Sequence, residues 1–311
     1  MKNKALVVVD FSYWMYVTIY GSITEFQKKN PIEYSYWLKD PKETDQHNLP
    51  DILNCEAFKK VLKKFVMKRC ETIDWHLKGH FKDELDCLDG VDILFAMDDK
   101  TSKSFRKSLY PEYKAHRKLM PKQFDIQKVK EYIFDVIFKE LELEEKYGYR
   151  FISVSGAEAD DIIATVISKC SDDYKLKVLF ASDHDFLQLE GVTQIDLFGK
   201  KIVPKINDEE VSRKEYLICK ILTGDKSDNI ESVFTRVGPK KALNLARDLE
   251  SLKNKLKEDQ TAAKRFSLNK KLIAFTEIPK QLTESIIEKA NMLLYKNEVL
   301  NDDGFDNLNW L

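Results

Sequence analysis

The sequence predicts an α/β protein with a mostly parallel central sheet that is covered by helices on both faces. Short apolar runs with strand character recur along the first two thirds of the chain, and amphipathic helical stretches lie between them. Strand signals cease at about residue 206. Continuous apolar strands that alternate with helices are typical of parallel sheets buried on both faces. The expected strands lie within residues 5–10, 91–98, 151–161, 176–185 and 193–198.

The intervening segments read as helices and one loop. Helical periodicity covers residues 55–73, 125–140 and 157–170. Residues 26–50 are polar and contain three prolines, so we expect a loop insertion there. The segment from 206 to Leu311 carries only helical patterns. The sequence therefore predicts an α/β core at residues 1–205 and a helical, DNA-binding region at residues 206–311.

The composition places the protein in the cytoplasm. The chain has 311 residues, 43% of them hydrophobic, and its 51 basic and 52 acidic residues nearly cancel. The five cysteines are scattered without a C-x-x-C pair, which favours a reducing compartment and argues against zinc or a disulfide framework. The apolar run at the N-terminus stops at Asp10, which is too short for a signal peptide. No stretch is long enough to span a membrane.

Acidic residues follow several of the predicted strands. In "SGAEADDIIATV" (155–166), three carboxylates fall within four positions at the start of a helix. Helix starts favour acids, so capping alone explains one or two of them. The carboxyl ends of parallel strands meet at one edge of a sheet, where ligands bind. Four such acidic strand ends in one chain favour a shared site over independent capping.

A shared cluster of carboxylates needs countercharge. Oxygen ligands without histidine or cysteine suit Mg²⁺, for which Mn²⁺ can substitute, and two hydrated ions can activate water and stabilise a leaving oxygen. His184, inside "SDHDF", is expected to be structural or exposed. Asp225 and Asp228 in "GDKSDN" fit a capped loop when taken alone. The candidate metal ligands are Asp10, Asp98, Glu158, Asp160, Asp161, Asp183, Asp185, Asp225 and Asp228.

Residues 100–122, "KTSKSFRKSLYPEYKAHRKLMPK", hold eight Lys or Arg residues and a single acid, with Phe and Tyr interleaved. Such a stretch is typical of a surface that meets phosphates and stacks bases. A solvated basic face is the alternative. The stretch starts directly after Asp98 and Asp99, at the rim of the predicted metal site, and this position favours nucleic-acid binding.

Taken together, the motifs resemble those of the 5′-nuclease family, which includes flap endonucleases, polymerase exonuclease domains and phage 5′-exonucleases. In length and layout the chain is most similar to the family's phage branch, the ribonuclease H of T-even-type bacteriophages. The resemblance covers most of residues 4–250 and implies a PIN-like core. It rests, in order, on "VVVDFS", "FAMDD…FRKSLYPEYKAHR", "GAEADDIIAT", "ASDHDFLQL" and "LTGDKSDNI…VGPKKAL".

The resemblance implies roles for individual residues. Asp10, Asp98, Glu158, Asp160 and Asp161 would serve a first metal region, with Asp160 central to catalysis. Asp183, Asp185, Asp225 and Asp228 would serve a second region. A helical arch at about 99–124 would contact the scissile phosphate, and a helix–turn–helix element after "GDKSDN" would bind duplex backbone. The implied nucleic-acid contacts are Lys103, Arg106, Lys107, Tyr113, Lys114, Arg117, Gly238, Lys240 and Lys241, of which Lys114, Arg117 and Arg106 would be catalytic.

One departure from the family pattern concerns that element. Relatives carry glycines after "DN", whereas this chain has "IESVFTRVGPKK". Glycine supports backbone conformations that Ser232 and Thr235 tolerate poorly. We therefore expect a different turn, which also affects any monovalent-cation site there.

The leading hypothesis is a Mg²⁺-dependent 5′→3′ nuclease acting on duplex DNA and RNA–DNA hybrids, nicked or with a 5′ flap, which removes primers in replication. Candidate partners are a single-strand-binding protein and a sliding clamp, and we expect a monomer. One alternative is a phosphatase with Asp10 as nucleophile, although Ser12 stands where a second acid is usual. Another is a non-catalytic nucleic-acid-binding relative.

Overall fold

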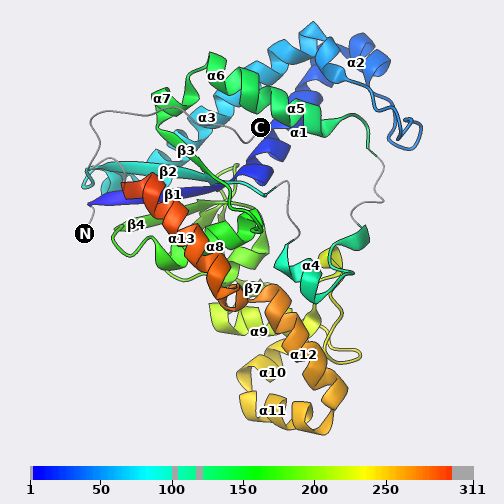
Figure 1. The fold of residues 1–311 in the computed structure, drawn as a ribbon, viewed down its shortest axis with the longest axis vertical. Helices are drawn as coiled ribbons and strands as arrows, with labels where there is room; N and C mark the ends of the chain where they lie inside the picture. The colour runs from blue at the N-terminus through cyan, green and yellow to red at the C-terminus, as the bar shows by residue number, and fades with distance from the viewer. Residues whose placement is uncertain (1–2, 100–103, 117–121, 296–311) are drawn as a thin grey trace.

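A six-stranded sheet forms the centre of the computed structural model, which describes residues 3–99, 104–116 and 122–295 (Figure 1). The strand order is β3-β2-β1-β4-β5-β6, with the first five strands parallel and β6 antiparallel to β5. The predicted fold class is confirmed. The strands are β1 (Lys4–Asp10), β2 (Gly90–Ala96), β3 (Tyr149–Ile152), β4 (Leu176–Phe180), β5 (Thr193–Ile195) and β6 (Lys201–Ile202).

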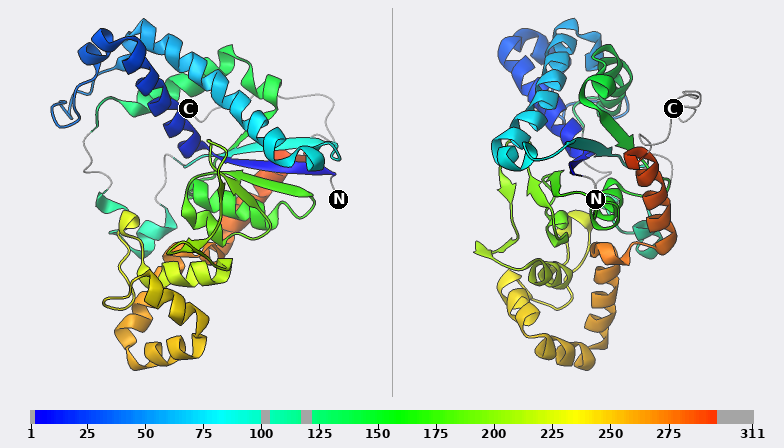
Figure 2. Two further views of the ribbon diagram at one scale, coloured as in Figure 1. Left: turned by 180° about the vertical axis from the view of Figure 1, so that it is seen from behind. Right: turned by 90° about the vertical axis from the view of Figure 1, so that its left-hand side faces the viewer.

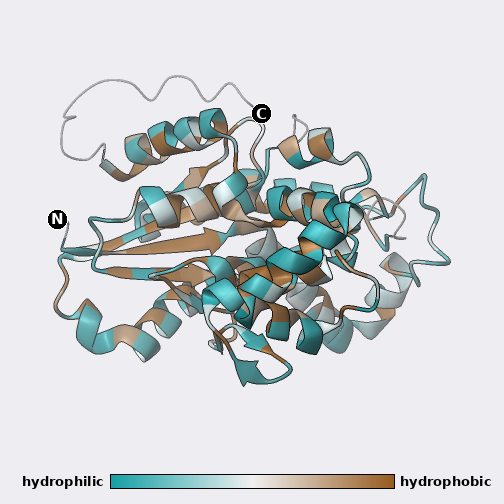
Figure 3. Cartoon of the chain, turned by 90° about the horizontal axis from the view of Figure 1, so that it is seen from below, coloured by the Kyte–Doolittle hydropathy of each residue, from teal (hydrophilic) through white to brown (hydrophobic). Residues whose placement is uncertain are grey.

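The central strand β1 shows why the sheet needs two helical layers. All of its residues from Ala5 to Val9 have no exposed surface. Side chains alternate between the faces of a strand, so Val7 and Val9 join one apolar cluster, whereas Leu6 and Val8 join another. The apolar strands accordingly lie between helices whose outer faces are polar (Figure 3).

Helices α1 and α3 cover the first face. α1 (Phe11–Lys29) starts directly at the end of β1, and α3 (Glu56–Leu85) packs beside it. Trp14 and Phe58 are fully buried in this cluster. Further helical segments complete the layer: α5 (Ile126–Tyr132), the π-helical turn Ile133–Ile137, α6 (Phe138–Glu140) and α7 (Leu143–Tyr147).

The predicted loop insertion at residues 26–50 is wrong in its first half. α1 continues to Lys29, and α2 (Pro31–Trp37) follows with Pro31 at its first turn. Proline is tolerated there because the first N–H groups of a helix have no intrahelical partner. Residues 38–51 contain no helix or strand, and the short 3₁₀ turn Ile52–Asn54 then leads into α3.

The second face is covered by α8 (Ala159–Lys169) and by α13 (Lys280–Tyr295), the last helix of the described chain. Ile286, Ala290 and Leu294 of α13 are buried against the α8 side of the sheet. This last helix therefore belongs to the α/β core, although the sequence placed all of residues 206–311 in a helical DNA-binding region. Helical periodicity identifies the apolar face of a helix but not its packing partner.

The remaining C-terminal helices form a module at the opposite end of the molecule from α2 (Figure 2). A small hairpin of β7 (Lys205–Ile206) and β8 (Glu209–Glu210) precedes it. The module has its own apolar cluster, which includes Leu222, Val233 and Leu243. Its helices are α9 (Arg213–Thr223), α10 (Pro239–Arg247), α11 (Leu249–Glu258) and α12 (Gln260–Ile273), and α4 (Phe105–Leu109) lies against α12.

Two expectations from composition can be compared with the fold. No helix in the described ranges is both long enough and apolar enough to cross a membrane. All five cysteines fall within those ranges, and each is a free thiol there.

Candidate metal and nucleic-acid site

Carboxylates from distant parts of the chain meet in one pocket of about 180 Å³ at the carboxyl edge of the sheet. Asp10 is the last residue of β1, Asp98 follows β2, Asp160 lies in the first turn of α8 and Asp183 follows β4. The strand order places these ends side by side, as the sequence predicted for one shared edge. The pocket is lined by Asp10, Ser12, Asp98, Lys114, Ala159, Asp160, Asp183, Asp185, Asp225, Ser227 and Asp228.

Helix starts hold two of these acids in position. Asp10 caps α1 by accepting a hydrogen bond from the N–H of Tyr13 (3.0 Å). Asp98 accepts one from the N–H of Ala159 (2.9 Å) at the start of α8 and one from the Ser12 hydroxyl (3.0 Å). These contacts fix both carboxylates at the pocket, and the partial positive charge of helix N-termini favours them there.

The acids at the centre of the pocket repel one another. Burial raises the pKa of Asp10 to about 6, with further contributions from Asp98 and Asp183. Burial also raises the pKa of Asp160 well above its usual value. The charge of Lys114 opposes this rise, whereas the charges of Asp10 and Asp183 add to it. Raised carboxyl pKa values mean that the charged forms lack sufficient countercharge, which is the condition that a bound cation relieves.

A closed loop brings two further acids to the pocket. The N–H and C=O of Asp225 and Ile230 pair with each other, so residues 225–230 turn back on themselves. Gly224 makes this possible, because its φ is +69° and a Cβ there would lie 2.4 Å from the carbonyl oxygen of Ile230. Asp225 and Asp228 consequently line the pocket together with Asp183.

The described residues place two lysines among these acids. Lys114 Nζ donates to Glu158 Oε1 (2.9 Å) and lies 3.9 Å from Asp228 Oδ2. Its own N–H donates to the Asp228 carbonyl, and its φ of +56° is unusual for a residue other than glycine. Lys220 of α9, which the sequence analysis did not single out, forms salt bridges with Asp185 and with Asp225 (3.2 Å).

The structure gives Arg106 and Asp161 a different place from the one predicted. Arg106 is 3% exposed, and its guanidinium binds Asp161 Oδ1 (2.8 Å), Glu158 Oε2 (2.9 Å) and the carbonyl of Leu272 (2.8 Å). Asp161 is fully buried and also accepts from the N–H of Glu158. Neither residue lines the pocket. Arg106 therefore holds α4 against α8 and α12, because a buried charge requires a paired charge nearby.

Other predicted contact residues are distributed around the pocket. Tyr113 is 3% exposed, packs with Ile221 and Leu272, and donates to Glu158 Oε2, so its ring face is not open to a base. Lys107 is exposed on α4. Lys103 and Arg117 lie outside the described residues.

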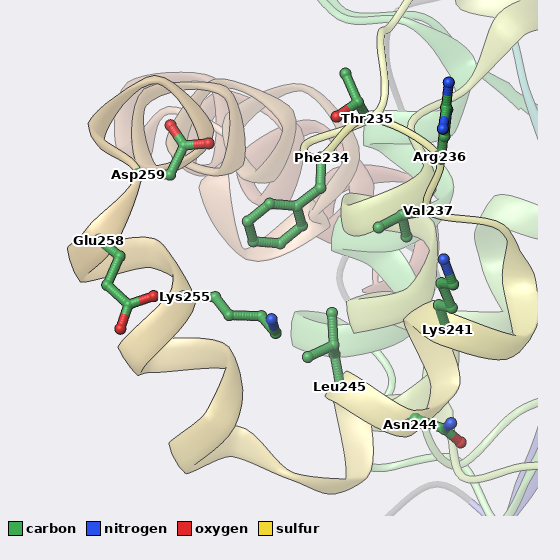
Figure 4. A pocket seen from close by; sticks show the side chains of 10 residues that line it. All are labelled: Phe234, Thr235, Arg236, Val237, Lys241, Asn244, Leu245, Lys255, Glu258 and Asp259. Atoms are coloured by element: carbon green, nitrogen blue, oxygen red, sulfur yellow. The ribbon is translucent and has the colours of Figure 1, made fainter.

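The second candidate nucleic-acid surface lies at the start of α10. Gly238 caps this helix, and Lys240 and Lys241 are exposed in its first turn. The left-handed residue of the preceding turn is Arg236 (φ 60°), whereas Ser232 and Thr235 avoid that conformation. Lys241 also borders a depression of about 550 Å³ between this turn, α10 and α11, in which Phe234 and Leu245 lie (Figure 4).

An aromatic face of α1 was not predicted. Tyr16 and Tyr20 are 44% and 49% exposed, and their rings stack in parallel with centroids 5.9 Å apart. Lys130 Nζ lies 4.5 Å from the centre of the Tyr16 ring. Positions 12, 16 and 20 share one helical face. The two rings therefore lie on the same face of α1 as Ser12, which lines the pocket. The i, i+4 spacing was visible in the sequence, but exposure was not.

The oxygen donors of the pocket fit hard divalent ions. Within the described ranges, no three His, Cys, Asp or Glu side chains are grouped closely enough to enclose an ion by themselves. Mg²⁺ commonly keeps several water ligands in protein sites, so it does not require that all of its ligands be side chains. His184, the one histidine beside these acids in the sequence, is exposed, as expected.

Comparison with known proteins identifies this part of the chain. Residues 83–217 match the family model described as "5'-3' exonuclease, N-terminal resolvase-like domain". They include Asp98, Asp160 and Asp183 of the pocket. This region is therefore similar to the 5′-3′ exonuclease family. A 5′-3′ exonuclease of Buchnera aphidicola (subsp. Schizaphis graminum) is 30% identical over 161 residues, which are 50% of this chain and 53% of that protein.

A second curated relative is similarly distant. Flap endonuclease Xni of a Shewanella species is 31% identical over 156 residues, covering 48% of this chain and 55% of the relative. The chain thus spans about half the length of the curated relatives that it matches.

Solved structures of bacteriophage T5 proteins share the fold. The T5 5′-exonuclease with bound divalent metal ions (zinc) has a TM-score of 0.57 at 16% identity, covering 93% of this chain and 99% of the other. The T5 flap endonuclease in a complex with DNA and metal ions has a TM-score of 0.56 at 14% identity, covering 93% and 98%. The described chain, including its C-terminal helices, therefore shares the overall fold of these T5 proteins.

Proposed function

We propose that the protein is a divalent-metal-dependent 5′→3′ nuclease that hydrolyses phosphodiesters in duplex DNA and RNA–DNA hybrids, including nicked and 5′-flap substrates. Removal of RNA primers during replication is the role we assign to it. The observation that carries the proposal is the convergence of Asp10, Asp98, Asp160 and Asp183 in one pocket, in which the pKa values of Asp10 and Asp160 are raised. The match of residues 83–217 to the family model of the 5′-3′ exonuclease N-terminal domain supports it.

Mg²⁺, or Mn²⁺ in its place, is the cofactor that we propose. Asp10, Asp98, Asp160 and Asp183 would hold one ion, and Asp185, Asp225 and Asp228 would hold another, largely through water. When bound, such ions lower the pKa of water and neutralise phosphate charge. The zinc and DNA complexes of the T5 proteins support metal and nucleic-acid binding by this fold.

The chain itself supplies binding and orientation. Lys114 presents an ammonium group at the wall of the pocket, held by Glu158, and this group can bind the scissile phosphate as charge develops on it. Arg117 is proposed to assist it. The exposed rings of Tyr16 and Tyr20 can stack on bases of the strand that leaves the pocket. Lys107, Gly238, Lys240 and Lys241 are proposed to contact the duplex backbone.

Product-length analysis tests this function. The protein is incubated with 5′-labelled nicked duplex, RNA–DNA hybrid and 5′-flap substrates, in Mg²⁺ and in EDTA, and Asp183→Asn serves as the inactive control. We expect short 5′ products in Mg²⁺ alone and none from the variant. Equal cleavage in EDTA, or binding without cleavage in Mg²⁺, would contradict the proposal; the latter would favour a non-catalytic relative. The expected monomeric state, cytoplasmic location and protein partners stay predictions.

A further inference from the structure

Lys220 extends from α9 into the part of the acidic pocket formed by Asp185 and Asp225. Its ammonium group contacts Asp185 Oδ1 and lies 3.2 Å from Asp225 Oδ2. The three side chains are only 15%, 20% and 18% exposed, so solvent screens their charges weakly. One fixed cation therefore bridges two carboxylates that come from η4 (His184–Gln188) and from the loop after α9.

The other part of the pocket has a different balance of charge. Of the described residues, none forms a salt bridge with Asp10, Asp160 or Asp183, and Lys114 is engaged by Glu158 instead. The acidic pocket is thus divided into a region whose acids form no salt bridge among the described residues and a region in which Lys220 bridges two acids. Two divalent ions that enter this pocket would therefore have different charged surroundings.

We propose that Lys220 is a positioning residue that competes with the second divalent ion: its ammonium group holds Asp185 and Asp225 together, and an ion enters that region only by displacing it. The inference rests on the proposed function, since it presupposes that the pocket binds divalent ions. Displacement breaks two salt bridges and brings like charges together. The first ion therefore binds tightly between Asp10, Asp98, Asp160 and Asp183, and the second binds more weakly.

Metal titration of the full chain without nucleic acid tests the role of Lys220. Free Mn²⁺ is followed by electron paramagnetic resonance for the wild type, Lys220→Met and Lys214→Met. Lys214 is an exposed residue of the same helix, so its variant removes the same charge without touching the pocket. We expect Lys220→Met to tighten the weaker site by at least about 10-fold, or about 1.4 kcal/mol, and to leave the tighter site within about threefold.

The outcomes separate this inference from the proposed function. Lys214→Met should reproduce both wild-type affinities, and Lys220→Arg, which keeps the charge, should retain a weak second site. An unchanged or weaker second site in Lys220→Met would overturn the role of Lys220 alone. Failure of the wild type to bind any Mn²⁺ would instead overturn the proposed function. Thermal unfolding checks that each variant is folded, and Lys220→Gln replaces the Met variant if that one unfolds.

Discussion

Two buried aspartates at opposite edges of the same sheet differ sharply in how their charge is compensated. Asp92, near the start of β2, is 4% exposed and binds the Tyr174 hydroxyl (2.7 Å), Arg150 Nη1 (2.9 Å) and Lys4 Nζ (3.6 Å). Burial alone would raise the pKa of Asp92, but these partners hold it below its usual value. The acid at the amino edge is therefore structurally satisfied.

Asp10, at the end of the neighbouring strand β1, is 8% exposed but has acids as its close charged neighbours. Burial raises its pKa to about 6. A fold does not retain such destabilising charges without a reason, and strongly perturbed acids in a pocket mark candidate functional sites. The comparison indicates that uncompensated charge, and not burial or acidity alone, distinguishes the functional edge of this sheet.

Asp160 and Asp161 are adjacent in the sequence but differ in the same way in how their charge is compensated. Their substitution gives the largest expected effect. Asp160→Asn should reduce cleavage at least about 100-fold, since even partners outside a metal's direct ligands commonly contribute 10- to 100-fold. Asp161→Asn should instead destabilise the fold by about 3 kcal/mol, because it leaves Arg106 without its buried partner. Single-turnover cleavage and urea unfolding measure the two effects. Loss of stability in Asp160→Asn with full activity would reverse the assignment.

At the amino edge, Asp92→Asn should cost about 2 kcal/mol of unfolding free energy at pH 7, with cleavage unchanged. A carboxyl with a lowered pKa contributes stability above its usual value near 3.8 and loses it as the pH falls through the folded-state value. The difference between wild type and variant should accordingly shrink at pH 3. Urea titrations at both pH values measure it, and a difference that does not depend on pH would contradict the ion-pair explanation.

At the carboxyl edge, we expect the opposite dependence of stability on pH for the metal-free protein. The raised pKa of Asp10 favours folding at low pH, and this contribution is lost as the pH rises from 3.8 to above about 6. Asp10→Asn should thus stabilise the EDTA-treated protein by about 1–3 kcal/mol at pH 8 and have little effect near pH 4. Asparagine also caps helices, so α1 should be retained. Destabilisation at pH 8 would show that Asp10 is compensated after all.

The smallest expected effect concerns the aromatic face of α1. Tyr20→Ala should raise the KM for a 5′-flap substrate several-fold, equivalent to about 1 kcal/mol for one base-stacking contact, and leave kcat nearly unchanged. Tyr36 of α2, which is 76% exposed, provides a matched control whose removal should change neither constant. Equal effects of the two variants would remove the stacking role of Tyr20.

Much of the fold and of the pocket could be predicted from the chain alone. Apolar runs followed by acids indicated both the strands and the edge at which Asp10, Asp98 and Asp183 meet, because the end of a parallel strand is a local feature with a fixed place in the sheet. The end of α1 and the helix α2, which starts at Pro31, were missed, since proline in the first turn of a helix resembles proline in a loop.

The pairing of charges was decided only by the tertiary structure. Glu158, Asp160 and Asp161 are almost adjacent in the sequence, yet Arg106 binds two of them and leaves Asp160 to the pocket. The contact of Lys220 with Asp185 and the packing of α13 against the sheet are also decided by the tertiary structure. The local sequence pattern determines which helix or strand carries a side chain and on which face. Which cation reaches which acid depends on distances between segments far apart in the chain, and these exist only once the core has packed.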